Sequence, residues 1–291
     1  MSIEASKSNA RAVYYPQPDG SMRLARVQVF SSPRFRSDGW EDVKPKRSAW
    51  EEALEEGKRM RKGKTAAKPE DRTEDDLLRA TRRARRNAFD LIMCNYDLDA
   101  FVTFTYSPEA VEDKKAYEEC YKYLRIWLSN GVQRDCLKYI VIPELTKKGD
   151  IHFHALCNQA ALKLEAARNP HNGRLIKHHG DQVYNVTNWK RGFTTAQLIC
   201  DREGATNSRE AVAKYMFKYM TKEIGAKIGG RYYLHGGDLK KPVLAYGDGA
   251  SQFITDEEAA IADVYSVALP HGGGNYTEYN FLAPRVSENR K

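Results

Sequence analysis

The chain has 291 residues, among them five cysteines and 47 Lys and Arg against 39 Asp and Glu, for a net charge of +8. This length can bury one sizeable core with appendages, and the positive charge favours a polyanionic partner, although a basic protein without one has the same composition. No stretch approaches the roughly 18 apolar residues of a membrane span, and neither a signal peptide nor a C-x-x-C pair occurs, so we expect a cytoplasmic protein without a membrane partner.

Residues 1–85 are expected to form an accessory region. A Pro18-Asp19-Gly20 turn between apolar stretches predicts a hairpin, and a charged, helix-prone segment follows. Residues 58–86 hold twelve Lys and Arg against five Asp and Glu. The end of this stretch forms either a solvated helix face or, as we prefer, a face that contacts DNA phosphates. Its arginines are Arg79, Arg82, Arg83, Arg85 and Arg86.

Residues 86–249 carry the regular pattern of a folded domain. Apolar periodicity predicts, in chain order, strand 100–106, helix 114–133, strand 137–142, strand 151–157, strand 192–199 and helix 208–224. This order is typical of an α+β fold of the ferredoxin or RNA-recognition type, an antiparallel sheet with helices on one side. The last segment, 250–291, is weakly patterned and is expected to decorate the surface or fray.

Two histidines separated by one aromatic residue lie in the strand predicted after a tight turn at 147–150. Side chains at i and i+2 of a strand share a face, so His152 and His154 can reach one metal ion while Phe153 faces the core. Glu144 closes the preceding strand, and the hairpin brings it back beside His152. Two imidazoles and a carboxylate leave coordination positions open, as catalytic Mn²⁺ or Mg²⁺ requires. The alternatives are hydrogen-bonded core histidines and a carboxylate that caps a turn.

The last predicted helix repeats Tyr-x-x-Lys twice, from Tyr215 to Lys218 and from Tyr219 to Lys222. Positions i and i+4 of a helix share a face, so both phenols can be offered to one site. Because the unperturbed phenol pKa is near 10, a nucleophilic tyrosine needs positive charge nearby, which a lysine one turn away or a metal ion supplies. The alternative is that the tyrosines only pack and the lysines are solvated.

Together, the segments FVTFTYSPE, PELTKKGDIHFHALC and KYMFKYMTKE resemble the three ordered motifs of HUH endonucleases. More narrowly, they resemble the rolling-circle replication-associated proteins of bacterial plasmids, integrated elements and small single-stranded DNA phages. The resemblance covers about residues 88–245. It implies the HUH endonuclease fold, a divalent ion held by His152, His154 and Glu144, and a bacterial host cytoplasm as the setting.

The resemblance also implies that Tyr219 or Tyr215 attacks single-stranded origin DNA and leaves a 5′-phosphotyrosine link and a free 3′-hydroxyl. The spacing favours two active tyrosines, one that cuts and one that accepts the strand when replication ends. Tyr219 is the first choice, since Lys222 lies one turn on and Lys218 beside it. Host polymerase would extend the 3′-end, and a host helicase is needed because no Walker-type motif occurs.

Residues 229–239, GGRYYLHGGDL, combine Arg231 with paired tyrosines and glycines. This composition suits base stacking and close approach to a DNA backbone, and it equally suits an ordinary hairpin. Two other functions fit the whole sequence. A non-catalytic, RRM-like nucleic-acid-binding protein would stack bases on sheet aromatics, with incidental histidines. An HUH relaxase or transposase would use the same chemistry in another setting.

Overall fold

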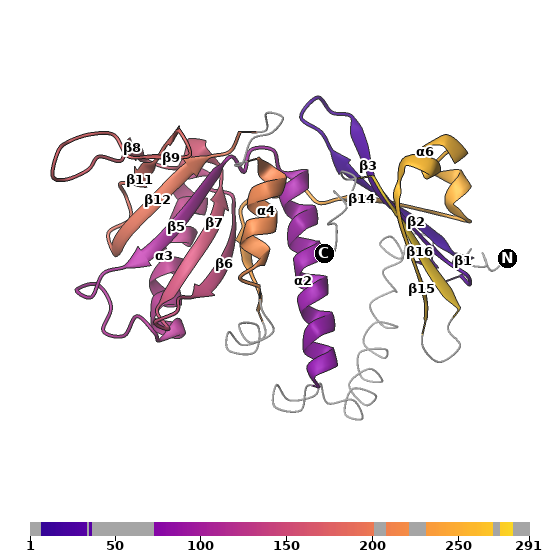
Figure 1. Cartoon of the computed structure of the whole chain (residues 1–291), viewed down its shortest axis with the longest axis horizontal. Helices are drawn as coiled ribbons and strands as arrows, with labels where there is room; N and C mark the ends of the chain where they lie inside the picture. The colour runs from indigo at the N-terminus through magenta and orange to yellow at the C-terminus, as the bar shows by residue number, and fades with distance from the viewer. Residues whose placement is uncertain are drawn as a thin grey trace, which may run out of the picture. The chain divides into compact units, whose positions relative to one another are not determined.

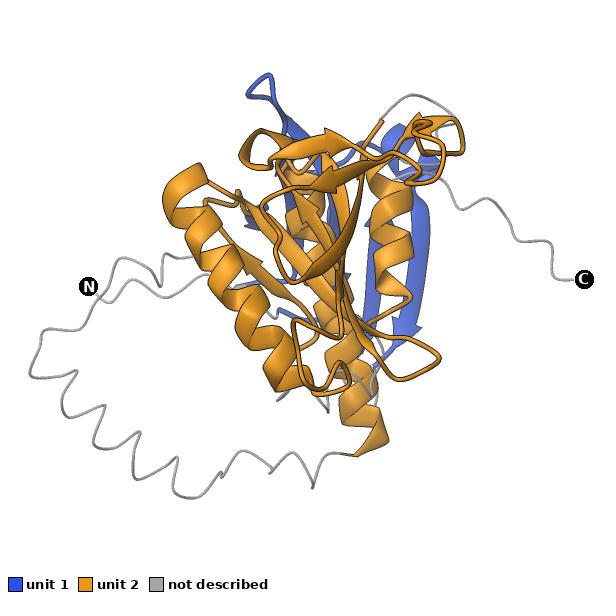
Figure 2. Cartoon of the chain, turned by 90° about the vertical axis from the view of Figure 1, so that its left-hand side faces the viewer, with its two compact units in different colours: residues 1–66, 242–291 blue, residues 67–241 orange. Residues whose placement is uncertain are grey.

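The computed structural model describes residues 7–33, 35–36, 73–200, 208–220, 231–269 and 274–281. The chain divides into two compact units, which Figure 2 colours separately: residues 67–241, and residues 1–66 together with 242–291. This division differs from the expected boundaries after residues 85 and 249. The basic helical segment belongs to the larger unit, and the C-terminal segment shares a unit with the N-terminal one.

The larger unit is built on a seven-stranded antiparallel sheet with strand order β13-β6-β7-β5-β12-β11-β8 (Figure 1). The predicted strands are confirmed, with small shifts of their ends. The strands are β5 (Ala100–Tyr106), β6 (Tyr139–Leu145), β7 (Ile151–Cys157), β8 (Leu164–Ala166), β11 (Tyr184–Val186), β12 (Gly192–Leu198) and β13 (Leu234–Gly236). A two-stranded hairpin, β9 (Lys177–His178) and β10 (Asp181–Gln182), lies in the connection before β11.

Three helices accompany this sheet: α2 (Glu74–Cys94), α3 (Tyr117–Asp135) and α4 (Arg209–Phe217). Helix α2 begins at a capping box, in which the Thr73 side chain accepts from the Asp76 backbone and the Asp76 side chain accepts from the Thr73 backbone. Helix α4 begins at Ser208, whose hydroxyl accepts from the Ala211 backbone N–H. None of the helices in the described ranges is long and apolar enough to cross a bilayer.

The helices cover both faces of the sheet (Figure 2), so the expectation that they lie on one side is wrong. Helix α3 packs on one face through Leu124 and Leu128, against residues such as Phe104. Helices α2 and α4 pack on the other face, against Ile142 and Leu156. The cause lies in β6 and β7, whose central residues are apolar on both faces, as in strands that are covered twice.

The smaller unit contains a five-stranded antiparallel sheet with order β14-β2-β3-β16-β15. Its strands are β2 (Ala10–Pro16), β3 (Met22–Phe30), β14 (Val243–Gly247), β15 (Asp263–Ala268) and β16 (Asn275–Asn280). The predicted hairpin is confirmed, and Gly20 in its turn has a φ of +85°, which glycine adopts without strain. The C-terminal segment, expected to be weakly patterned, instead supplies β15 and β16, and β16 pairs with β3.

Short elements cover and extend this smaller sheet. A 3-10 turn, η3 (Ala250–Gln252), and helix α6 (Asp256–Ile261) follow β14. Apolar residues near these elements, including Ile254 and Phe253, pack against Ala12 and Val27 of the β2–β3 hairpin. The short strands β1 (Lys7–Ser8) and β4 (Phe35–Arg36) pair with each other. The core of the sheet is therefore covered on one face by the segment that follows β14.

Candidate active site

The sheet register of the larger unit brings the predicted acidic residue beside the predicted histidines. Glu144 of β6 is paired with His152 of β7, and Thr103 of β5 is paired with His154. Glu144, His152 and His154 lie on the face covered by α2 and α4, because alternate residues of a strand point to opposite faces. Phe153 is fully buried on the α3 side, as the sequence predicts.

His154 makes two polar contacts through its ring. Its Nε2 lies 2.5 Å from Glu144 Oε2, and its Nδ1 lies 3.1 Å from the Thr103 hydroxyl. The side chain is almost completely buried. A neutral imidazole with its proton on Nε2 donates to Glu144 and accepts from Thr103, so both ring nitrogens are satisfied. Thr103 fixes the ring from a third strand, a role that sequence reasoning missed.

His152 is half-buried on the same face. Burial lowers the pKa of its imidazole, and the nearby carboxylate of Glu144 acts in the opposite direction. A lowered pKa favours the neutral imidazole, which is the form that binds a metal ion. His152 therefore has the protonation state of a metal ligand at neutral pH.

Within the described ranges, no group of three or more His, Cys, Asp and Glu side chains is arranged to hold a metal ion. Glu144 and His154 are instead bonded directly to each other. The donor set, two imidazoles and a carboxylate on one face, nevertheless has the chemistry of a catalytic Mn²⁺ or Mg²⁺ site. The rearrangement that binding requires is a turn of the Glu144 carboxylate away from the His154 ring.

Both predicted tyrosines lie against this cluster. The Tyr219 ring stacks on the His154 ring, with centroids 4.5 Å apart and planes at 17°. The Tyr215 ring meets His154 edge-on at 6.0 Å and Tyr219 at 5.2 Å. Phe101 of β5 also lies parallel to His154, at 5.7 Å. The structure thus brings together residues from three strands and the end of α4.

The expected helical spacing of the two tyrosines is only partly realised. Helix α4 ends at Phe217, and the backbone N–H of Tyr219 donates to the carbonyl of Met216, three residues earlier. Tyr219 therefore lies in a turn after the helix, while Tyr215 lies within it. Arg85 of α2 donates to the carbonyl of Met220 at 2.7 Å and so ties this turn to α2.

The two phenols have different surroundings. Burial raises the pKa of Tyr219, and a hydrogen bond with Tyr215 and the charge of Glu144 act in the same direction. Tyr215 is 41% exposed. Tyr219 is consequently held as a neutral phenol beside the carboxylate, and its ionisation needs a compensating positive charge.

The predicted lysines are placed differently from the tyrosines. Lys218 is exposed, and its Nζ lies 5.6 Å from the centroid of the Tyr215 ring. It accompanies Tyr215, whereas the sequence paired it with Tyr219. Lys222 lies outside the described residues.

A cavity of about 450 Å³ opens next to Tyr215 on the same face of the sheet. Its lining residues are Phe101, Thr103, His178, His179, Asp181, Thr195, Gln197, Ala211, Val212 and Tyr215. Phe101 and Thr103 belong both to this cavity and to the surroundings of His154. A strand of nucleic acid in the cavity would therefore lie against the exposed tyrosine.

The predicted DNA-binding arginines do not form one surface. Arg79 lies 4.0 Å from Asp75 in an exposed ion pair, and Arg85 holds the Met220 carbonyl. Arg83 lines a second pocket together with Arg231. Arg82 and Arg86 are exposed on α2. The segment therefore combines a structural contact with positions that solvent or a ligand can reach.

Residues 99–224 match the model of a family of replication-associated proteins, described by the name ORF2. This range contains Glu144, His152, His154, Tyr215 and Tyr219. No curated protein and no solved structure matches the chain. The family match over residues 99–224, which hold the whole cluster, fits a rolling-circle replication-associated protein.

Proposed function

We propose that the chain is a replication initiator that nicks single-stranded origin DNA through a tyrosine nucleophile. The observation that carries this proposal is the stacking of Tyr219 on His154, whose Nε2 is bonded to Glu144. A nucleophilic phenol next to two imidazoles and a carboxylate combines the groups that phosphoryl transfer to a tyrosine requires. The family match adds a replication setting for this chemistry.

In the proposed reaction, the Tyr219 oxygen forms a bond to phosphorus and the bond from phosphorus to the 3′-oxygen breaks. The products are a 5′-phosphotyrosine and a free 3′-hydroxyl, and the phenol proton is balanced by the proton that the 3′-oxygen gains. Glu144 is the carboxylate that acts on the phenol and is suited to hold this proton in transit. A bound Mn²⁺ or Mg²⁺, held by Glu144, His152 and His154, would supply Lewis-acid polarisation of the phosphate.

The second tyrosine is proposed to act at the end of replication. Tyr215 lies 5.2 Å from Tyr219 between ring centroids and is the more exposed of the two. A nucleophile that is accessible while the first tyrosine carries DNA can accept the newly made strand. The joined circle then forms when the 3′-hydroxyl attacks the first phosphotyrosine. Host polymerase and a host helicase are the proposed partners for synthesis and unwinding.

Incubation of the purified protein with Mn²⁺ and single-stranded DNA that carries the origin tests this proposal. We expect a covalent protein–DNA adduct that survives denaturation, depends on the metal, and is lost in the double variant Tyr215→Phe/Tyr219→Phe. Tyr265→Phe is a matched control, because Tyr265 is 51% exposed and lies on β15 of the smaller unit. An adduct that persists in the double variant contradicts the proposal.

A second candidate function is a nucleic-acid-binding protein without catalysis. Phe193 of β12 is 73% exposed, and it pairs with Thr105 on the sheet face that carries His152. An exposed aromatic ring on a sheet is the platform on which RNA-recognition-type domains stack bases. This candidate predicts DNA binding that chelators do not change and no adduct with any origin. A relaxase or transposase would form the adduct, but only with transfer-origin or element-end DNA.

A further inference from the structure

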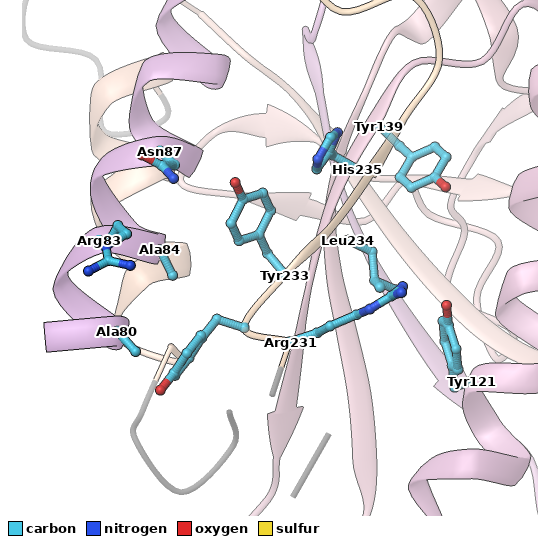
Figure 3. A pocket seen from close by; sticks show the side chains of 11 residues that line it. Ala80, Arg83, Ala84, Asn87, Tyr121, Tyr139, Arg231, Tyr233, Leu234 and His235 are labelled. Carbon is cyan, nitrogen blue, oxygen red and sulfur yellow. The ribbon is translucent and has the colours of Figure 1, made fainter. Parts of the chain in front are cut away.

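A second cavity, of about 600 Å³, lies beside the edge strand β13 (Figure 3). It is distinct from the cavity next to Tyr215, since the two have no lining residue in common. Helix α2 and the β13 segment supply most of its walls, and both lie outside the residues that match the family. Its volume is within the range of small-molecule and cofactor sites.

Four tyrosines give this pocket its aromatic character: Tyr121 of α3, Tyr139 of β6, and Tyr232 and Tyr233 just before β13. In Figure 3, Tyr233 and His235 lie on the side of the strand that faces α2, and Tyr121 and Tyr139 lie on the other side. The Tyr233 and His235 rings are 5.6 Å apart. Burial raises the pKa of Tyr139 and of Tyr233, so both phenols stay neutral. Neutral aromatic rings are the surfaces on which unpaired bases stack.

Two arginines give the pocket its charge. Arg83 on α2 and Arg231 before β13 both line it, and Figure 3 shows the Arg231 side chain extending toward Tyr121. Both arginines are exposed. Asn87, one turn after Arg83, adds an amide. No Asp or Glu occurs among the described lining residues, so the charge selects for an anion, and guanidinium groups bind phosphate oxygens with two parallel hydrogen bonds.

The pocket is far from the candidate active site along the sheet. Tyr139 begins β6 and Glu144 lies five residues further along the same strand. At about 3.3 Å per residue, this places the two sites roughly 17 Å apart. A ligand in the pocket therefore cannot also lie on Tyr219, and the two sites can be occupied at once by different parts of one strand.

We propose that this pocket binds an unpaired nucleotide of single-stranded DNA at a second site, away from the nick. A base stacks on the tyrosine rings, its phosphate is held by Arg83 and Arg231, and Asn87 and His235 are positioned to hydrogen-bond a base edge. The inference shares the DNA partner of the proposed function, but it requires neither the metal ion nor the tyrosine nucleophiles.

The test measures binding of a fluorescent single-stranded oligonucleotide by anisotropy, with EDTA present and in the Tyr215→Phe/Tyr219→Phe background, so that nothing is cleaved. The pocket variant is Arg83→Ala/Arg231→Ala. The control is Arg125→Ala/Arg134→Ala, which removes the same charge from exposed positions of α3 outside the pocket. We expect the pocket variant to weaken binding at least about tenfold and the control to weaken it less than about threefold. The salt dependence of log K should fall by about 0.7 per lost phosphate contact.

Photocrosslinking supplies a measurement that charge alone does not move. An oligonucleotide with 5-iodouracil should crosslink to a peptide that contains Tyr121, Tyr139 or Tyr233, and Tyr233→Leu should reduce the crosslink at that position. Equal losses in the pocket and control variants, or crosslinks only to peptides outside the pocket, overturn the inference. Failure to nick DNA would overturn the proposed function and leave this result unaffected, because binding is measured without metal and without the nucleophiles.

Discussion

The ring of Tyr219 lies on the ring of His154, with centroids 4.5 Å apart and planes at 17°. These residues are distant in the sequence and come from different elements, the turn after α4 and strand β7. Their contact joins the two motifs of the proposed nuclease, the histidine pair and the tyrosine pair. A substitution in either motif should therefore affect the same reaction.

Tyr219 and Tyr215 should be separable by single substitutions. Tyr219→Phe keeps the stacked ring and removes the hydroxyl, so we expect normal folding and a fall in the rate of the first nick on the order of 10³ or more. Tyr215→Phe should retain the first nick and lose the joining of the second strand. Rates of adduct formation and of circle formation on single-stranded origin DNA measure the two steps. Equal effects of both variants on the first nick would refute this division of roles.

Thr103 should act through His154. Thr103→Val removes the hydroxyl that is 3.1 Å from His154 Nδ1 and leaves a buried nitrogen without its partner. We expect a loss of about 1 to 3 kcal/mol in the free energy of unfolding and a slower nick. Thr103→Ser keeps the hydroxyl and is the matched control, which should preserve the nicking rate. Chemical denaturation and adduct kinetics provide the two readouts, and wild-type behaviour of the valine variant would count against the contact.

Glu144 should set the requirement for metal. Glu144→Gln keeps the size of the side chain, can still accept a hydrogen bond from His154, and loses the negative charge that a divalent cation needs. We expect the Mn²⁺ concentration for half-maximal adduct formation to rise at least about tenfold, equivalent to about 1.4 kcal/mol of binding free energy. A titration of Mn²⁺ with wild type and variant measures this, with Glu112→Gln as a control at an exposed position near the start of α3. An unchanged Mn²⁺ requirement would remove Glu144 from the metal site.

Arg85 should position the tyrosine turn and should not act as a DNA contact. Its guanidinium donates to the Met220 carbonyl at 2.7 Å, one residue after Tyr219. Arg85→Ala should cost about 0.5 to 1.5 kcal/mol in the free energy of unfolding and should slow the nick. The salt dependence of DNA binding should stay that of the wild type, because no phosphate contact is lost. A shallower salt dependence with an unchanged nicking rate would assign Arg85 to the DNA instead.

The sequence predicts the parts of the site whose geometry is local. Alternation along β7 places His152 and His154 on one face, and the short turn at 147–150 fixes Glu144 opposite His152. Neither inference needs knowledge of the rest of the fold, because strand period and hairpin register follow from neighbouring residues.

The rest depends on contacts between distant segments. Thr103 meets His154 only because β5 pairs with β7 in one particular register, and Phe101 follows from the same pairing. The C-terminal strand β16 pairs with β3, near the other end of the chain, which no local pattern records. Tyr219 lies beyond the end of α4, so a helical wheel places it only approximately. The helices on both faces follow from strands that are apolar on both sides, a pattern that a buried helix shares.

The most direct test of the central claim is to map the covalent adduct by mass spectrometry. Trypsin cleaves after Lys214, Lys218 and Lys222, so Tyr215 and Tyr219 fall in different peptides, YMFK and YMTK. After reaction with Mn²⁺ and single-stranded origin DNA, followed by nuclease digestion, the account predicts a residual nucleotide linked through phosphate to Tyr219 in YMTK. A nucleotide on any residue other than these two tyrosines, or no linked nucleotide with the cognate origin, would contradict it.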